Sequence, residues 1–106
     1  MIVKAQEAKH SVFQGVNFEV LAVGVETMVT KMHYEPGNFV SFHSHPNEQS
    51  GYVISGKYRL NVGDREDILT TGDSYSIPAN VLHSIEVLEA GEVVDVFTPP
   101  REDYLR

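Results

Sequence analysis

Short hydrophobic and alternating segments follow one another along the whole chain, and turn residues separate them at close intervals. Alternation of apolar and polar positions over about four to eight residues is typical of a β-strand with one buried face. Glycine, proline, asparagine and aspartate mark the connections, as in 35–38 and 63–64. The pattern predicts strands at residues 16–23, 26–34, 39–45, 50–55, 57–62, 68–70, 74–77, 83–88 and 92–98.

No segment keeps a helical period, so we expect helix only as a turn near one end of the chain. No internal repeat, low-complexity stretch or linker interrupts the strands. A chain of 106 residues with 42% hydrophobic residues can bury one small core. The sequence therefore predicts an all-β sandwich or barrel in which residues 1–106 form a single domain.

The balance of acidic and basic residues limits the kinds of partner that the protein is expected to bind. Eight basic residues stand against fifteen acidic ones, and no basic run occurs, which argues against nucleic acid or an anionic membrane surface as a partner. The absence of cysteine removes disulfides and thiolate ligands and is compatible with a reducing compartment. The first ten residues lack the apolar run of a signal peptide, so we expect a soluble, cytoplasmic protein.

Two histidines one residue apart, His43 and His45, are the most informative feature of the sequence. If both lay on the strand predicted at 39–45, their imidazoles would project to the same side. A third histidine, His83, begins a distant predicted strand. Neutral imidazole is the commonest protein ligand for divalent transition metals, so the three residues form a candidate metal site with an open position.

The segments 37–56 and 72–83 resemble the paired motifs of the cupin superfamily. The first has a glycine, five residues, His-x-His, a polar ligand and a later glycine; the second has a glycine, five residues, a proline and a histidine. The resemblance implies a double-stranded β-helix, that is, a jelly-roll barrel, that binds one divalent transition metal, with zinc, nickel, manganese, iron and cobalt all open. The implied ligands are His43, His45, Gln49 and His83.

The usual third ligand of this pattern is a glutamate, whereas Gln49 stands seven residues before Gly56, in the ligand position. Glu48 has the opposite strand parity. A neutral amide oxygen gives the metal one negative charge less than a carboxylate, which favours Lewis-acid chemistry over redox chemistry. Gly51 has the parity of Gln49 and could leave room for a substrate beside the metal.

The last predicted strand carries an acid, Asp95, in an otherwise β-branched and apolar run. Alternation puts Asp95 and Phe97 on one face and Val94 and Val96 on the other. If the valines pack the core, Asp95 is a surface residue. If Asp95 faces the lumen, it is a buried carboxylate beside a cation and can move protons. Spacing alone leaves both possibilities open.

The segment 94–105 is similar to the C-terminal signature of a group of cupins in pectin degradation that linearise unsaturated monouronates, and residues 43–49 and 72–78 share the likeness. The resemblance implies a homodimeric enzyme whose catalytic or substrate-binding residues are Asp95, Phe97 and Arg101. The expected reaction is the metal-dependent conversion of a cyclic 4,5-unsaturated monouronate, from pectin or alginate, to a linear 4-deoxy-5-keto uronate.

Two other functions remain open. Cupin motifs also suit a small metal-dependent oxygenase or lyase, because a fold does not determine a reaction. A non-catalytic sugar-binding cupin is the third possibility. Without the family likeness, Arg101 would be interpreted as a surface arginine after a rigid Pro-Pro segment, and His10 and His33 as solvated histidines.

Overall fold

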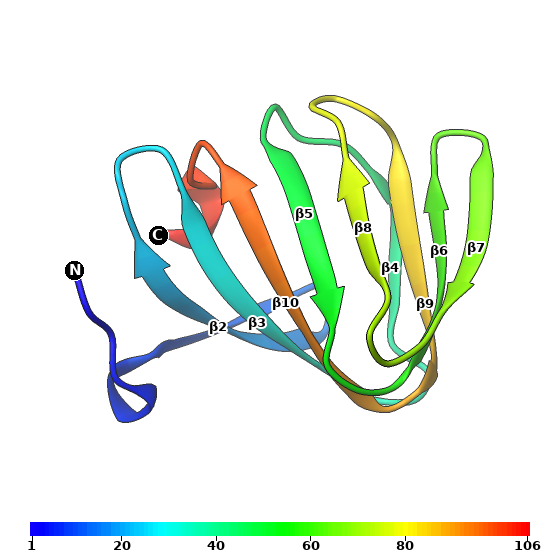
Figure 1. Ribbon diagram of the computed structural model, residues 1–106, viewed down its shortest axis with the longest axis horizontal. Helices are drawn as coiled ribbons and strands as arrows, with labels where there is room; N and C mark the ends of the chain where they lie inside the picture. Colours follow the sequence, from blue (N-terminus) through cyan, green and yellow to red (C-terminus); the bar gives the residue numbers. More distant parts are fainter.

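The computed structural model describes residues 1–106 and contains ten β-strands in two antiparallel sheets (Figure 1). Two short 3₁₀ turns, η1 (Ala5–Glu7) and η2 (Glu102–Tyr104), lie near the chain ends, and no α-helix forms. The strands are β1 (Lys9–Phe13), β2 (Val16–Val23), β3 (Met28–Tyr34), β4 (Phe39–His43), β5 (Glu48–Val53), β6 (Lys57–Val62), β7 (Arg65–Leu69), β8 (Ser74–Ile77), β9 (His83–Glu89) and β10 (Gly91–Thr98).

The larger sheet has the order β1-β2-β3-β10-β5-β8, and the smaller one has the order β4-β9-β6-β7. Strands that are distant in the chain therefore lie side by side. In particular, β10 is inserted between β3 and β5, with Asp95 paired to Thr30 on one side and to Gly51 on the other. Such crossed connections are typical of a jelly-roll barrel, so the predicted all-β fold is confirmed.

Alternate side chains of each strand fill the space between the sheets. In β3 every second residue from Met28 to Tyr34 is buried, and in β5 the buried positions are Gln49, Gly51 and Val53. Burial of the apolar side chains between the sheets supplies the main stabilisation of the fold. The core consists of Val16, Phe18, Val20, Met28, Met32, Tyr34, Val40, Val53, Tyr58, Leu60, Ile85, Val87, Val93, Phe97 and Tyr104.

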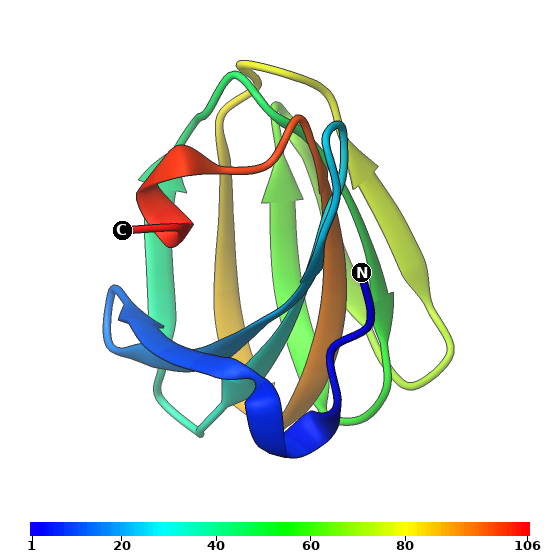
Figure 2. The ribbon, with the colours of Figure 1, turned by 90° about the vertical axis from the view of Figure 1, so that its left-hand side faces the viewer.

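The hairpin β1-β2 and the C-terminal segment cover one side of the barrel, which faces the viewer in Figure 2. The side chain of Gln14, in the β1-β2 turn, accepts hydrogen bonds of 3.0 Å from the backbone N–H and the hydroxyl of Ser41, on β4. The ring of Tyr104, in η2, packs against Phe18 at 4.4 Å between centroids. Both ends of the chain thus close the opening beside β4.

Each predicted strand overlaps a strand of the structure, but several bounds differ, and the range 68–70 covers only the end of β7 (Arg65–Leu69). The ranges 16–23, 57–62 and 74–77 coincide with β2, β6 and β8. β1 was not predicted, because its residues are mostly exposed and carry no alternation to detect. The strand predicted at 39–45 ends at His43, so His45 lies in the following loop.

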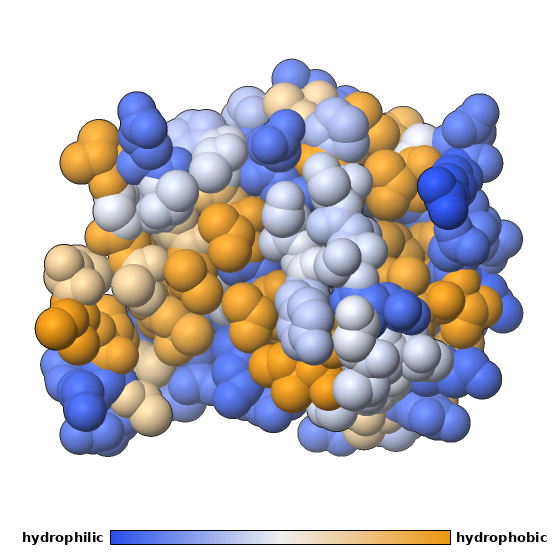
Figure 3. Space-filling model, in the orientation of Figure 1, coloured by the Kyte–Doolittle hydropathy of each residue, from blue (hydrophilic) through white to orange (hydrophobic).

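The surface of the protein carries both hydrophobic and hydrophilic residues. On the face seen in Figure 3, hydrophobic residues form scattered groups between hydrophilic ones. The outer face of the larger sheet carries Val94 and Val96, both half-buried, and an exposed Tyr52 in register with Val94. No helix of the protein has the length and apolar character needed to cross a bilayer.

Candidate metal centre

Three histidine rings meet at one end of the barrel although they come from different elements. His43 ends β4 and pairs in register with His83, the first residue of β9, while His45 lies in the loop after β4. The ring centroids of His43 and His83 are 4.2 Å apart, and those of His45 and His83 are 4.8 Å apart. One nitrogen of each ring lies within 4.8 Å of the others, a spacing that suits a metal ion.

The same kind of backbone contact orients all three rings. Each Nδ1 lies 2.9 Å from a carbonyl oxygen two residues away, which accepts a hydrogen bond from the Nδ1–H group. This contact leaves the lone pair of Nε2 free in each ring, as in metal-binding histidines whose tautomer is set by a second hydrogen bond. The pairs are His43 with Ser41, His45 with Asn47 and His83 with Val81.

Gln49 lies beside these nitrogens. It is buried on β5, and its Oε1 is 3.1 Å from Nε2 of His45. With His45 protonated at Nδ1, two electron-pair donors face each other at this distance. Adjacent ligands of one ion with bonds of about 2.0–2.2 Å are separated by about 3.0–3.5 Å. The donor set of three imidazoles and an amide therefore fits a divalent transition metal.

Burial keeps the histidines neutral. Desolvation lowers the pKa of His43 and of His45 below the usual value, and the positive charge of Arg101 lowers both further. The pKa of His83 falls to about 4, again mainly through desolvation. Neutral imidazole is the form that binds metal. The rings are therefore ready to act as ligands near neutral pH.

Asp95 faces the interior, which settles the choice that the sequence left open. Its exposed fraction is 2%, while Val94 and Val96 lie on the outer face. Burial raises the pKa of Asp95 to about 6, although the hydroxyl of Tyr75, the amide of Gln49 and the charge of Arg101 act in the opposite direction. A carboxyl with a pKa close to neutral pH can both accept and return a proton.

Arg101 is buried, with an exposed fraction of 5%, and is not a surface residue. Its guanidinium carbon lies 3.9 Å from the ring centroid of Tyr104 and 5.3 Å from that of Phe97. Such cation–π contacts stabilise a desolvated guanidinium. The group also donates to both carboxylate oxygens of Asp103, at 3.1 and 2.7 Å, and to the hydroxyl of Tyr104 at 3.0 Å.

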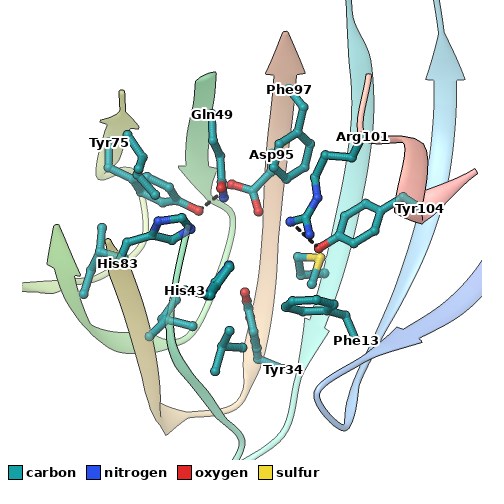
Figure 4. A pocket seen from close by; sticks show the side chains of 15 residues that line it. Phe13, Tyr34, His43, Gln49, Tyr75, His83, Asp95, Phe97, Arg101 and Tyr104 are labelled. Atoms are coloured by element: carbon teal, nitrogen blue, oxygen red, sulfur yellow. Dashed lines mark hydrogen bonds between the residues drawn. The ribbon is translucent and has the colours of Figure 1, made fainter. Parts of the chain in front are cut away.

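These side chains surround one small cavity of about 30 Å³ (Figure 4). His43, His83 and Gln49 lie on one side of it, and Asp95 and Arg101 on the other. The cavity has room for little more than a water molecule. A hollow of about 740 Å³, lined by His45, Pro46 and the segment 99–103, lies outside it, and Arg101 borders both spaces.

The structure brings together all seven residues singled out in the sequence. Phe97 is fully buried, and the centroid of its ring lies 5.7 Å from that of the His45 ring. The common strand face expected for His43 and His45 is wrong, because β4 has a bulge between Val40 and His43 and ends there. The rings converge because the loop turns back toward β9.

Several neighbours of the site were not predicted. Tyr75 and Tyr104 line the cavity; both fall within segments that share the family likeness, 72–78 and 94–105, but neither was named as a site residue. The space above Gly51 is filled by Tyr75 and Asp95, so this glycine does not leave room for a substrate. His33 is not merely solvated, since it pairs with Glu19 and with Glu92.

Residues 30–97 match the family model described as the Cupin domain, whereas no curated protein sequence matches the chain. A RmlC-like cupin from Shewanella frigidimarina is 28% identical, with a TM-score of 0.90 over 97% of this chain and 94% of that chain.

Two further solved structures share the fold. KdgF from Halomonas sp. is 23% identical, with a TM-score of 0.88 over 98% of this chain and 97% of that chain. Oxalate decarboxylase from Bacillus subtilis, a protein with Mn(II) centres, is 23% identical with a TM-score of 0.80, over 89% of this chain and 28% of that chain. Proteins of this fold thus include a metal-containing enzyme.

Proposed function

The chain belongs to the cupin domain family, and from this premise we propose that it is a metal-dependent enzyme that opens the ring of a cyclic 4,5-unsaturated monouronate and converts it to the linear 4-deoxy-5-keto uronate. One observation carries the proposal. A buried carboxyl, Asp95, and a buried guanidinium, that of Arg101, line the same cavity as His43, Gln49 and His83. An acid, an anion-binding group and a candidate metal site are the groups that this isomerisation needs.

The proposed ligands are His43, His45, Gln49 and His83, through the three Nε2 atoms and the amide oxygen. A bound divalent ion would supply Lewis-acid stabilisation of the negative charge that develops on oxygen. The metal identity stays open, because a site of this kind accepts several first-row ions. A Gln49→Glu substitution would add a negative charge at the site, and we expect it to weaken that stabilisation.

Asp95 moves the proton in the proposed reaction. Its carboxylate accepts the proton of the anomeric hydroxyl, C1 becomes a carbonyl, and the bond between C1 and the ring oxygen breaks with its electrons left on that oxygen. The resulting enolate takes a proton at C4 and becomes the 5-keto product. The protons balance and no oxidant is consumed. A pKa of about 6 suits a group that accepts and then returns a proton near neutral pH.

Arg101 and Phe97 bind the substrate in this proposal. The planar fork of an arginine matches a carboxylate in two parallel hydrogen bonds. In the structure the guanidinium of Arg101 is bound by the carboxylate of Asp103. In the proposal, the carboxylate of a bound uronate takes the place of the Asp103 carboxylate. Phe97 offers an apolar surface to the sugar ring. The substrate enters from the outer hollow, whose volume falls in the usual range for small-ligand sites.

One line of support is independent of this geometry. The C-terminal segment 94–105 is similar in sequence to the uronate-linearising cupins of pectin degradation. The likeness to KdgF covers nearly the whole length of both chains, and at 23% identity it supports the fold alone. We also propose a homodimer in the cytoplasm, which sedimentation of the purified protein and localisation of a tagged chain would test.

The testing experiment follows the loss of the absorbance of the substrate double bond. The purified 4,5-unsaturated monouronate is mixed with metal-loaded protein, metal-free protein, and the variants Asp95→Asn and Asp64→Asn. Asp64 is exposed in the β6-β7 turn and is not among the residues that line the cavity, so it controls for the loss of a carboxylate. We expect decay faster than in buffer for the metal-loaded wild type and Asp64→Asn, and none for the other two.

Decay no faster than in buffer for every sample would refute the proposal. Binding of the uronate without turnover would then favour the sugar-binding alternative. Oxygen consumption by an iron-loaded sample would favour an oxygenase. Both outcomes would leave the cupin fold unchanged, since the same barrel carries different reactions.

A further inference from the structure

The side chain of Tyr75 reaches the proposed catalytic acid, Asp95, across a strand position that has no side chain. In the larger sheet Gly51 on β5 pairs in register with Tyr75 on β8 and with Asp95 on β10. The two residues therefore stand on the same row and face of the sheet, separated by one strand. Their side chains meet above Gly51, where the Tyr75 hydroxyl donates a hydrogen bond of 2.5 Å to Oδ1 of Asp95 (Figure 4).

Only glycine allows this contact at position 51. A Cβ atom there would lie 2.2 Å from Cζ of Tyr75, 2.4 Å from its hydroxyl and 2.5 Å from Oδ1 of Asp95. All three distances are shorter than any real carbon contact, so one of the two side chains would have to leave. Three paired positions in the sheet therefore depend on one another: Tyr75 supplies the phenol donor, Gly51 the space, and Asp95 the carboxylate.

A hydrogen bond from a phenol restricts a carboxylate in a definite way. The torsion about the bond to an aspartate carboxyl group is broad and nearly free when nothing holds it. The donor fixes this torsion and engages one oxygen, which directs the other oxygen of Asp95. Holding a reacting group in the productive orientation accelerates the chemical step and has little effect on substrate affinity.

Resting on the proposed function, we propose that Tyr75 is the positioning residue of Asp95, and that Gly51 is required because it leaves the space in which the two side chains meet. The phenol hydroxyl touches neither the outer hollow nor Arg101, and its other neighbour is the amide of Gln49, which acts on the pKa of both Tyr75 and Asp95. Loss of the hydroxyl should reduce kcat and leave KM unchanged, and the metal content tests whether Gln49 stays in place.

Tyr52 offers a matched control. It follows Gly51 on β5, and its side chain is exposed on the outer face of the sheet. It lines neither the cavity nor the outer hollow. The substitutions Tyr75→Phe and Tyr52→Phe each remove one hydroxyl and keep the ring.

The experiment measures kcat and KM for the unsaturated monouronate, the metal content and the melting temperature of the wild type, Tyr75→Phe and Tyr52→Phe. A hydrogen bond to a charged group is worth roughly tenfold to a hundredfold in an equilibrium or a rate. We expect Tyr75→Phe to lower kcat by that factor with KM and metal content within about twofold of wild type, and Tyr52→Phe to keep both kinetic constants within about twofold.

A second readout follows the contact itself, through the ¹³C resonance of the Asp95 carboxyl carbon at fixed pH. We expect it to move in Tyr75→Phe and to stay in place in Tyr52→Phe. Gly51→Ala should lower kcat as Tyr75→Phe does, and the double variant should be no worse than either single one, because both remove the same contact.

Equal kcat in Tyr75→Phe and wild type would overturn the inference, as would equal losses in the two tyrosine variants, a loss of metal, or an effect on KM alone. These results differ from failure of the proposed function. In that case the wild type itself would not turn over the uronate, and the role of Tyr75 would fall with it.

Discussion

Removal of His83 should abolish the thermal stabilisation that a divalent metal gives to this protein. His83 contributes one of three imidazoles whose nitrogens lie within 4.8 Å of one another. A ligand that binds only the folded state stabilises it by about 2.7 kcal/mol at a free concentration of about a hundred times Kd. For a domain of this size, that corresponds to a rise of about 11–22 °C in the melting temperature.

The His83→Ala variant should lose most of this rise. Even the removal of an outer partner of a ligand costs up to about a hundredfold in metal affinity, and His83 is proposed as a ligand itself. After a hundredfold loss, the same metal concentration equals Kd and adds about 0.4 kcal/mol, or about 2–3 °C. The metal-induced shift should therefore shrink from above 10 °C to a few degrees, by about the same factor with Zn²⁺ or Ni²⁺.

The assay is differential scanning fluorimetry with and without the metal, and each variant is compared with its own metal-free form. This comparison cancels the packing lost with the His83 ring. His10→Ala is the matched control, because His10 lies exposed on β1, away from the cavity lining. An undiminished shift in His83→Ala, or an equal loss in His10→Ala, would refute the three-histidine site.

Arg101→Lys keeps the charge but loses the planar fork, so KM for the uronate should rise about tenfold or more in steady-state kinetics; an unchanged KM would exclude carboxylate binding by Arg101. The hydrogen bond from His33 lowers the pKa of Glu19 below 4.5 despite partial burial, so Glu19 stabilises the fold above about pH 4.5, and this stabilisation is lost as the pH falls through the lowered pKa. Urea unfolding of Glu19→Gln should therefore show a flatter pH dependence in that acidic range, and a curve parallel to wild type would contradict this. Gly91→Ala places a Cβ 2.1 Å from the carbonyl oxygen of Ser55 and should destabilise by about 1–3 kcal/mol; an unchanged melting temperature would argue against this close approach.

The glycines illustrate what alternation and turn chemistry predict and what they miss. Gly63 and Gly72 have positive φ angles, as expected for turn residues. Gly91, by contrast, begins β10, and the close approach of Ser55 requires a glycine there. The first reason is local and visible in the sequence. The second depends on a backbone 36 residues away.

In the candidate site, too, local sequence signals were informative, whereas contacts between distant segments were missed. The motif spacing predicted the candidate metal ligands, but the expected common strand face was wrong for His45, which lies in a loop. The contact of Tyr75 with Asp95 was missed because it depends on a register that joins β8, β5 and β10. No pattern within a single strand contains that information.

The sequence by itself determined the β class, most strand limits, and the identity and relative parity of the candidate site residues, because side-chain alternation and turn propensity are local properties. The tertiary structure alone decided which parity faces inward. Asp95 became a buried acid because β10 is inserted between β3 and β5 with Val94 and Val96 turned outward. Arg101 became a buried cation because η2 and β1 enclose it in aromatic rings. Both outcomes depend on pairings between distant segments, which a local pattern cannot specify.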